Sequence, residues 1–210
     1  MKTRQIFVNN NGEGIVAALD ETENFSGYNH LAKQDALNVR LLSEETLGMV
    51  RAITGEFSAL FWIEGDENSC EIHLHAKTEM NRGKRSDLLS VSTTGKNMAA
   101  KTLMGKIRDL IEVSLENYES VDQLQMKYGK MGSLAYGNWG MESMEGSSTA
   151  VAQSWSLAEY KKDVHDAMGE NQFADQAWDE LEKSIVAKLA DNVRVGIKSD
   201  EVQLIIYKKF

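Results

Sequence analysis

The chain has 210 residues, a length that suits a single domain able to bury a substantial core. Its net charge of −9 argues against a general affinity for nucleic acid, because the average surface would repel phosphates. Hydrophobic residues make up 42% of the chain, which excludes wholesale disorder, yet no apolar run approaches the roughly 18 residues that a membrane span requires. We therefore expect no nucleic-acid partner and no membrane segment.

The cysteine content indicates the cellular compartment. The single cysteine, Cys70, cannot form an internal disulfide, which is typical of proteins in a reducing compartment. Residues 1–7 carry positive charge, but no long apolar stretch follows them, so the sequence predicts no signal peptide. We expect a soluble, cytoplasmic protein.

The first elements are a short strand over residues 4–9, with Ile6 and Val8 on one face, and a helix over 15–25. The strongest helix signal follows, over residues 35–54. Its apolar residues share one arc of the helical wheel and are expected to face the core: Ala36, Val39, Leu42, Leu47, Met49, Val50 and Ile53.

A β-hairpin follows, with strands over 59–64 and 70–77 joined by a turn over 65–68. In the second strand apolar and polar residues alternate, which predicts one buried and one solvated face. Cys70 lies on the apolar face and is expected to be a core residue. His73 and His75 lie two apart on the other face, a spacing that can bind a metal. Without a further Cys or His partner, we interpret them as solvated and predict no metal site.

The second half of the chain predicts a loop over 79–97, a helix over 97–116, helices over 157–168 and 174–190, and a closing hairpin over 193–198 and 201–207. Leu103, Ile107, Leu110 and Ile111 mark the inner stripe of the first of these helices. A glycine- and methionine-rich segment, residues 128–148, is expected to be a surface loop, a lid or a partner-binding loop. The fold class is α+β, with a mixed or antiparallel sheet and helices packed on one face.

Several well-known motifs are missing from the sequence. There is no phosphate-binding loop, no G-x-G-x-x-G fingerprint, no C-x-x-C and no G-x-S-x-G elbow. Chemistry must therefore be sought in less regular patterns.

The central helix carries one such pattern, Leu-Leu-Ser-Glu-Glu-Thr-Leu-Gly-Met-Val-Arg-Ala-Ile over residues 41–53. It resembles the first conserved helix of the histidine-kinase, gyrase and Hsp90 ATP-binding fold, especially the bacterial anti-sigma-factor kinase branch. That resemblance implies a catalytic role for Glu44, which would position the attacking water or hydroxyl. The family has an Asn that helps to hold Mg²⁺ four residues later, where this chain has Gly48. Ala52 shares the face of Glu44 and Gly48.

Two later segments resemble the rest of the nucleotide site. Residues 79–83 read Glu-Met-Asn-Arg-Gly, after the hairpin where the family has Asp-x-Gly-x-Gly, and the acid there would accept a hydrogen bond from the adenine amine. The family's glycine-rich lid would correspond to residues 92–106, with the phosphate near the start of a helix. The resemblance thus implies a set of nucleotide-binding residues: Gly48, Ala52, Glu79, Asn81, Gly83, Gly95, Lys96, Lys101 and Gly105.

The order of predicted elements agrees with this family over most of the chain. It implies a single domain over 1–210, a two-layer sandwich of the Bergerat type, with residues 117–173 as an insertion. Three hypotheses of function follow. The first is a regulatory module that binds ATP or ADP without Mg²⁺, or binds a protein partner. The second is an active anti-sigma-type serine kinase or ATPase with Glu44 as base. The third is an interaction protein that uses the loop 128–148.

Overall fold

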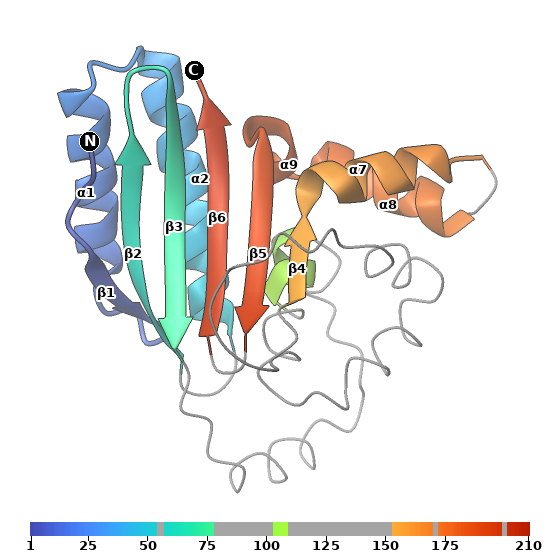
Figure 1. Ribbon diagram of the computed structural model, residues 1–210, viewed down its shortest axis with the longest axis horizontal. Coiled ribbons are helices and arrows are strands. Elements are labelled where there is room, and N and C mark those ends of the chain that lie inside the picture. The colour runs from blue at the N-terminus through green and yellow to red at the C-terminus, as the bar shows by residue number, and fades with distance from the viewer. Residues whose placement is uncertain (54–56, 78–102, 109–152, 170–171, 199–200) are drawn as a thin grey trace, which may run out of the picture.

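The computed structural model describes residues 1–53, 57–77, 103–108, 153–169, 172–198 and 201–210 (Figure 1). Besides a helical segment over 103–108, these residues form the following elements in chain order: β1 (Ile6–Asn9), α1 (Ile15–Tyr28), α2 (Lys33–Ala52), β2 (Ser58–Gly65), β3 (Ser69–Lys77), β4 (Gln153–Ser156), α7 (Leu157–Asp166), α8 (Gln172–Lys183), α9 (Ile185–Leu189), β5 (Asn192–Lys198) and β6 (Glu201–Lys209). The predicted loop 128–148, and most of the predicted loop 79–97 and helix 97–116, lie outside the described residues.

The strands form one six-stranded sheet in the order β1-β2-β3-β6-β5-β4, and every neighbouring pair is antiparallel. The predicted α+β class and both predicted hairpins are therefore confirmed. Leu74 of β3 lies opposite Leu204 of β6, so the closing hairpin continues the sheet directly beside the first one. β4, which falls within residues 117–173, adds the edge strand next to β5.

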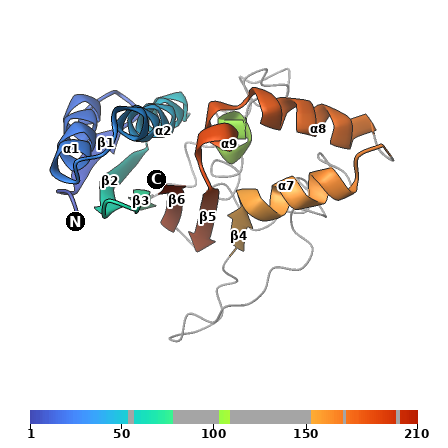
Figure 2. The ribbon, with the colours of Figure 1, turned by 90° about the horizontal axis from the view of Figure 1, so that it is seen from above.

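The helices gather on one side of this sheet. Figure 2 shows α1 and α2 side by side over one face and α9 on the other flank of α2. α7 and α8 pack against each other and extend past the β4 edge. Within the described part of the chain, no helix combines the length and apolarity that crossing a bilayer requires.

The core lies between the helical layer and the sheet, and every second residue along the strands contributes its side chain to the core. The apolar residues of β3 and β6 that point toward the helices, such as Leu74 and Leu204, are at most 2% exposed. Six of the seven residues predicted to form the core face of α2 are buried, and only Ala36 is half-buried. Cys70 is buried as predicted, and this burial raises the pKa of its thiol to about 12. Such a thiol is inert at neutral pH.

The helix predicted over residues 174–190 is divided into two helices, α8 and α9. The chain breaks at Ser184, whose hydroxyl accepts a hydrogen bond from the Ala187 backbone N–H and so starts α9 as a new helix. The break changes which residues face inward. A continuous helix over 174–190 would place Ile185 on the inner face, one turn after the buried Leu181, but Ile185 is 44% exposed, whereas Val186 and Ala187 are buried. A single helical wheel drawn across Ser184 is therefore wrong.

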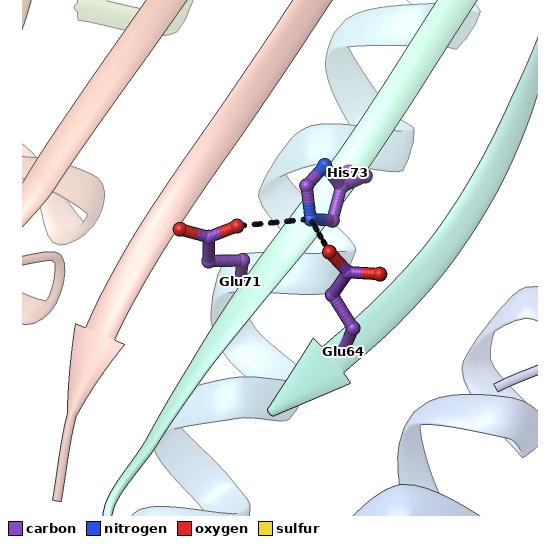
Figure 3. Close-up of side chains that lie close together, drawn as sticks. All are labelled: Glu64, Glu71 and His73. Atoms are coloured by element: carbon purple, nitrogen blue, oxygen red, sulfur yellow. Dashed lines mark ion pairs between the residues drawn. The ribbon is translucent and has the colours of Figure 1, made fainter. Parts of the chain in front are cut away.

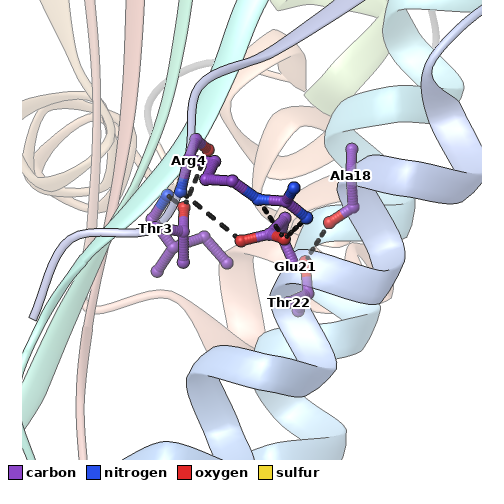
Figure 4. Close-up of polar contacts among 6 residues, drawn as sticks. Thr3, Arg4, Ala18, Glu21 and Thr22 are labelled. Atoms are coloured by element: carbon purple, nitrogen blue, oxygen red, sulfur yellow. Dashed lines mark hydrogen bonds and ion pairs between the residues drawn. The ribbon is translucent and has the colours of Figure 1, made fainter.

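Hydrogen bonds attach the N-terminal segment to both the sheet and the helical layer (Figure 4). The Thr3 backbone N–H donates to the Ile63 carbonyl at 2.8 Å, and the Ile63 N–H donates to Thr3 Oγ1 at 2.9 Å. The Arg4 guanidinium donates to the Glu21 carboxylate of α1, with Nε to Oε1 at 3.0 Å. This hydrogen bond lowers the pKa of Glu21, whose side chain is only 7% exposed.

Candidate functional site

The outward face of α2 carries three of the four described residues that the family resemblance singles out. Glu44, Gly48 and Ala52 are all exposed, on the side of the helix opposite its core arc. Glu44 Oε1 accepts a hydrogen bond from Arg40 Nε at 2.9 Å, and Arg40 also pairs with Glu23 of α1. Glu44 thus belongs to a surface chain of ion pairs that links the two helices.

Gly48 lies at an open position of α2. A Cβ atom built there would meet no atom within 4 Å, so neither the sheet nor a neighbouring helix requires the absence of a side chain. Gly48 and Ala52 provide no metal ligand, and Glu44 alone provides a single carboxylate. This face of α2 therefore holds too few ligands to fix a Mg²⁺ ion by itself.

A second carboxylate on α2 faces a different direction. The Thr22 hydroxyl of α1 donates to Ser43 Oγ at 3.3 Å, which places α1 on the Ser43 flank of α2. At 100° per residue, Glu45 lies about 200° around the helix from Ser43. It is half-buried and lies on the flank of α2 away from α1. The family resemblance implies a catalytic role for Glu44 alone, and Glu44 lies on the exposed face of α2 rather than on this flank.

The remaining predicted nucleotide-binding residues are mostly beyond what the structure describes. Glu79, Asn81, Gly83, Gly95, Lys96 and Lys101 lie outside the described residues. Gly105 is described, and it is buried within the helical segment 103–108. The structure therefore brings Glu44, Gly48 and Ala52 together on one helix face and does not bring Gly105 to that exposed face.

Lys106, next to Gly105, is held by α7 and α8. Its ammonium lies 3.3 Å from Tyr160 Oη and 2.5 Å from Glu180 Oε2. Burial lowers the pKa of Lys106, but Tyr160 and Glu180 outweigh that effect, so its pKa is raised overall. The lysine is charged and already paired, which leaves it poorly placed to bind a phosphate.

A groove of about 770 Å³ opens on the outer surface between α1 and α2. Residues from both helices and the turn between them line it, among them Ser26, Leu31, Leu37 and Arg40. None of the three exposed α2 residues Glu44, Gly48 and Ala52 lines this groove. The groove therefore lies beside these residues without including them, and Arg40, which lines it, donates a hydrogen bond to Glu44.

The face of the sheet away from α1 and α2 holds a second cluster (Figure 3). His73 was predicted to be solvated, but it is 6% exposed, because its ring stacks on the Trp62 indole with centroids 4.7 Å apart and planes 3° from parallel. Glu64 and Glu71 approach its Nε2 atom at 3.4 and 3.2 Å. Sequence reasoning missed Glu64 and Glu71 because it sought only Cys and His partners. The hairpin register, which sets Glu64 opposite Glu71, could have revealed them.

Comparisons with known proteins were made at three levels. A scan against protein-family models, a search of curated proteins and a search of solved structures each gave no match.

Proposed function

We propose that the chain is a regulatory module that binds ATP or ADP, built on a histidine-kinase-type ATP-binding fold without Mg²⁺-dependent phosphoryl transfer. The observation that carries the proposal is the order of elements. A strand is followed by two neighbouring helices, a hairpin and, at the end of the chain, a further helix and a closing hairpin. The pattern over residues 41–53 resembles that family, and the element order agrees with the same family.

The end of α2 and the end of β3 lie at the same end of the sheet, which supports a single site. Ala59 near the start of β2 lies opposite Ala76 near the end of β3, so both lie at the end of the sheet where α2 finishes (Figure 1). The motif over residues 79–83 begins two residues after β3 ends at Lys77. The chain therefore leaves the described sheet toward this motif at the end where α2 finishes, and the motif itself lies outside the described residues.

The surroundings of α2 favour binding without turnover. A general base must be free to take a proton from the nucleophile. Glu44 instead accepts a charge-assisted hydrogen bond from Arg40, and Gly48 provides no ligand for the metal that phosphoryl transfer needs. Among the described residues, no contact of this kind supports the second hypothesis, an active kinase.

Isothermal titration of the full chain with ATP and ADP, with and without Mg²⁺, tests the proposal. We expect saturable binding below millimolar nucleotide with an affinity that changes less than about threefold when Mg²⁺ is removed, and no phosphate release. Ala52→Glu should weaken binding at least about tenfold by adding a negative charge to the face of α2 that the proposal assigns to an anionic nucleotide. Ala17→Glu, at an exposed position of α1, is the matched control. Absence of binding at millimolar nucleotide contradicts the proposal, and phosphate release that Glu44→Ala abolishes would establish an active ATPase instead.

A further inference from the structure

Three metal-ligating side chains converge on the sheet face away from α1 and α2. Glu64 comes from the end of β2, and Glu71 and His73 come from one face of β3. One ligand atom from each, an imidazole nitrogen and two carboxylate oxygens, lies within 4.8 Å of the other two. Figure 3 shows both carboxylates directed at the same ring nitrogen of His73.

His73 is more deeply buried than a strand-surface histidine should be. It is 6% exposed, with Trp62 stacked on one side of its ring. Neither ring nitrogen has a hydrogen-bond partner among the described residues. Leaving a buried polar group without a partner costs about 1–3 kcal/mol, and native proteins do so rarely. Nε2 has only the ion-pair contacts with Glu64 and Glu71, and Nδ1 has no hydrogen-bond partner among the described residues, so this buried imidazole can accept a ligand.

The distances suit a small tetrahedral ion. With metal–ligand bonds of about 2.0–2.1 Å, two ligands of a tetrahedral zinc site lie about 3.3 Å apart. The two distances from His73 Nε2 to Glu64 Oε1 and Glu71 Oε2 are 3.4 and 3.2 Å. Both carboxylates are half-exposed, so a small side-chain rotation can complete the third edge. One position would remain for water.

One contact from outside the cluster orients Glu64. The second oxygen of Glu64, Oε2, is held by the Lys2 ammonium at 3.1 Å, which leaves Oε1 directed at His73. Such outer contacts orient the ligands of metal sites.

We propose that Glu64, Glu71 and His73 bind one divalent transition-metal ion, with Zn²⁺ as the best fit, on the sheet face away from α1 and α2. The mixed nitrogen and oxygen donors favour Zn²⁺ over Mg²⁺ and Ca²⁺, which prefer oxygen ligands alone. This site is separate from the proposed nucleotide site and does not depend on it. The simpler arrangement, in which the two carboxylates only form ion pairs with Lys2 and His73, predicts no metal affinity.

The test is a titration of the full-length chain with ZnCl₂ in a non-chelating buffer, followed by calorimetry. We expect one Zn²⁺ per chain and a rise in Tm when the ion is added. His73→Phe keeps a ring for stacking on Trp62 and removes both nitrogens, so the fold should persist while affinity falls at least about tenfold. Glu71→Gln should weaken binding by a similar factor. Circular dichroism and the metal-free Tm verify that each variant is folded.

His75→Phe is the matched control, because it makes the same exchange two residues along the same strand face. It should leave Zn²⁺ affinity within about twofold of the unchanged protein. The proposal is overturned if Zn²⁺ binds only weakly at several sites without loss in His73→Phe. It is equally overturned if His75→Phe removes binding as fully as His73→Phe does.

Discussion

The two faces of the central sheet treat polar groups in opposite ways. On the face covered by helices, the strands present apolar side chains, and the buried Thr46 in the layer above donates a hydrogen bond to the Leu42 carbonyl at 2.8 Å. On the other face, His73 is buried beside Trp62 with neither nitrogen hydrogen-bonded among the described residues. The covered face is thus packed for stability, whereas the other face holds a buried polar group that lacks full hydrogen bonding, which is typical of a binding site.

Truncating a leucine on each face should give the largest contrast. Leu74 is 2% exposed on the covered face of β3, and Leu60 of β2 is 37% exposed on the other face. Leu74→Ala should lower the free energy of unfolding by about 2–5 kcal/mol, because it leaves a cavity in the core. Leu60→Ala should cost less than about 1 kcal/mol. Urea denaturation measures both. Equal losses would mean that the two faces are equally well packed.

Cysteine reactivity tests the covered face chemically. Since the pKa of Cys70 is raised from 9.0 to about 12, the folded protein should hold about a thousandfold less thiolate than the unfolded chain near pH 8. A disulfide reagent such as Ellman's should therefore react with Cys70 slowly in buffer and rapidly in denaturant. Rapid reaction in buffer would show that this part of the strand is open to solvent.

The pH dependence of stability tests whether the carboxylate of Glu21 is stabilised by its partner, Arg4. Its pKa is lowered by the hydrogen bond from Arg4, so its contribution is fully present above the carboxyl pKa of the unfolded chain, about 4.3, and is lost as the pH falls below it. Glu21→Gln should cost about 1–2 kcal/mol at pH 7 and flatten the loss of stability on acidification. Glu44→Gln, in an exposed pair, is the control and should leave the pH profile unchanged. Parallel profiles for Glu21→Gln and the unchanged protein would contradict this role.

The smallest effect is expected on the outward face of α2. Gly48→Ala should raise stability by about 0.5–1 kcal/mol, because the position is helical, exposed and free of neighbours within 4 Å. Gly14→Ala is the contrasting variant. Gly14 has φ 75°, and a Cβ there would collide with the Phe7 carbonyl, so that variant should be destabilised. A loss of stability in Gly48→Ala would indicate that this face of α2 is covered.

Periodicity was sufficient to predict most of the fold. The apolar arc of α2 predicted which side of that helix faces the core, and the alternation in β3 predicted which side chains of that strand are buried in it. Both predictions were confirmed. The break at Ser184 was missed because a helix cap and an interior serine read alike in one sequence. The burial of His73 was missed for a different reason. It depends on Trp62 lying directly opposite across the hairpin, a contact that period-2 alternation cannot distinguish from solvent.

The most direct test of two separate sites is amide chemical-shift mapping of one ¹⁵N-labelled sample, titrated first with ATP and then with ZnCl₂. We predict that ATP shifts the resonances of α2, including Gly48 and Ala52, and leaves those of Glu71 and His73 in place. Zn²⁺ should then shift the resonances around Glu64, Glu71 and His73 and leave α2 unchanged. Overlapping sets of shifted residues, or no shift in α2 at millimolar ATP, would contradict a nucleotide module with a distinct metal centre on the other face of its sheet.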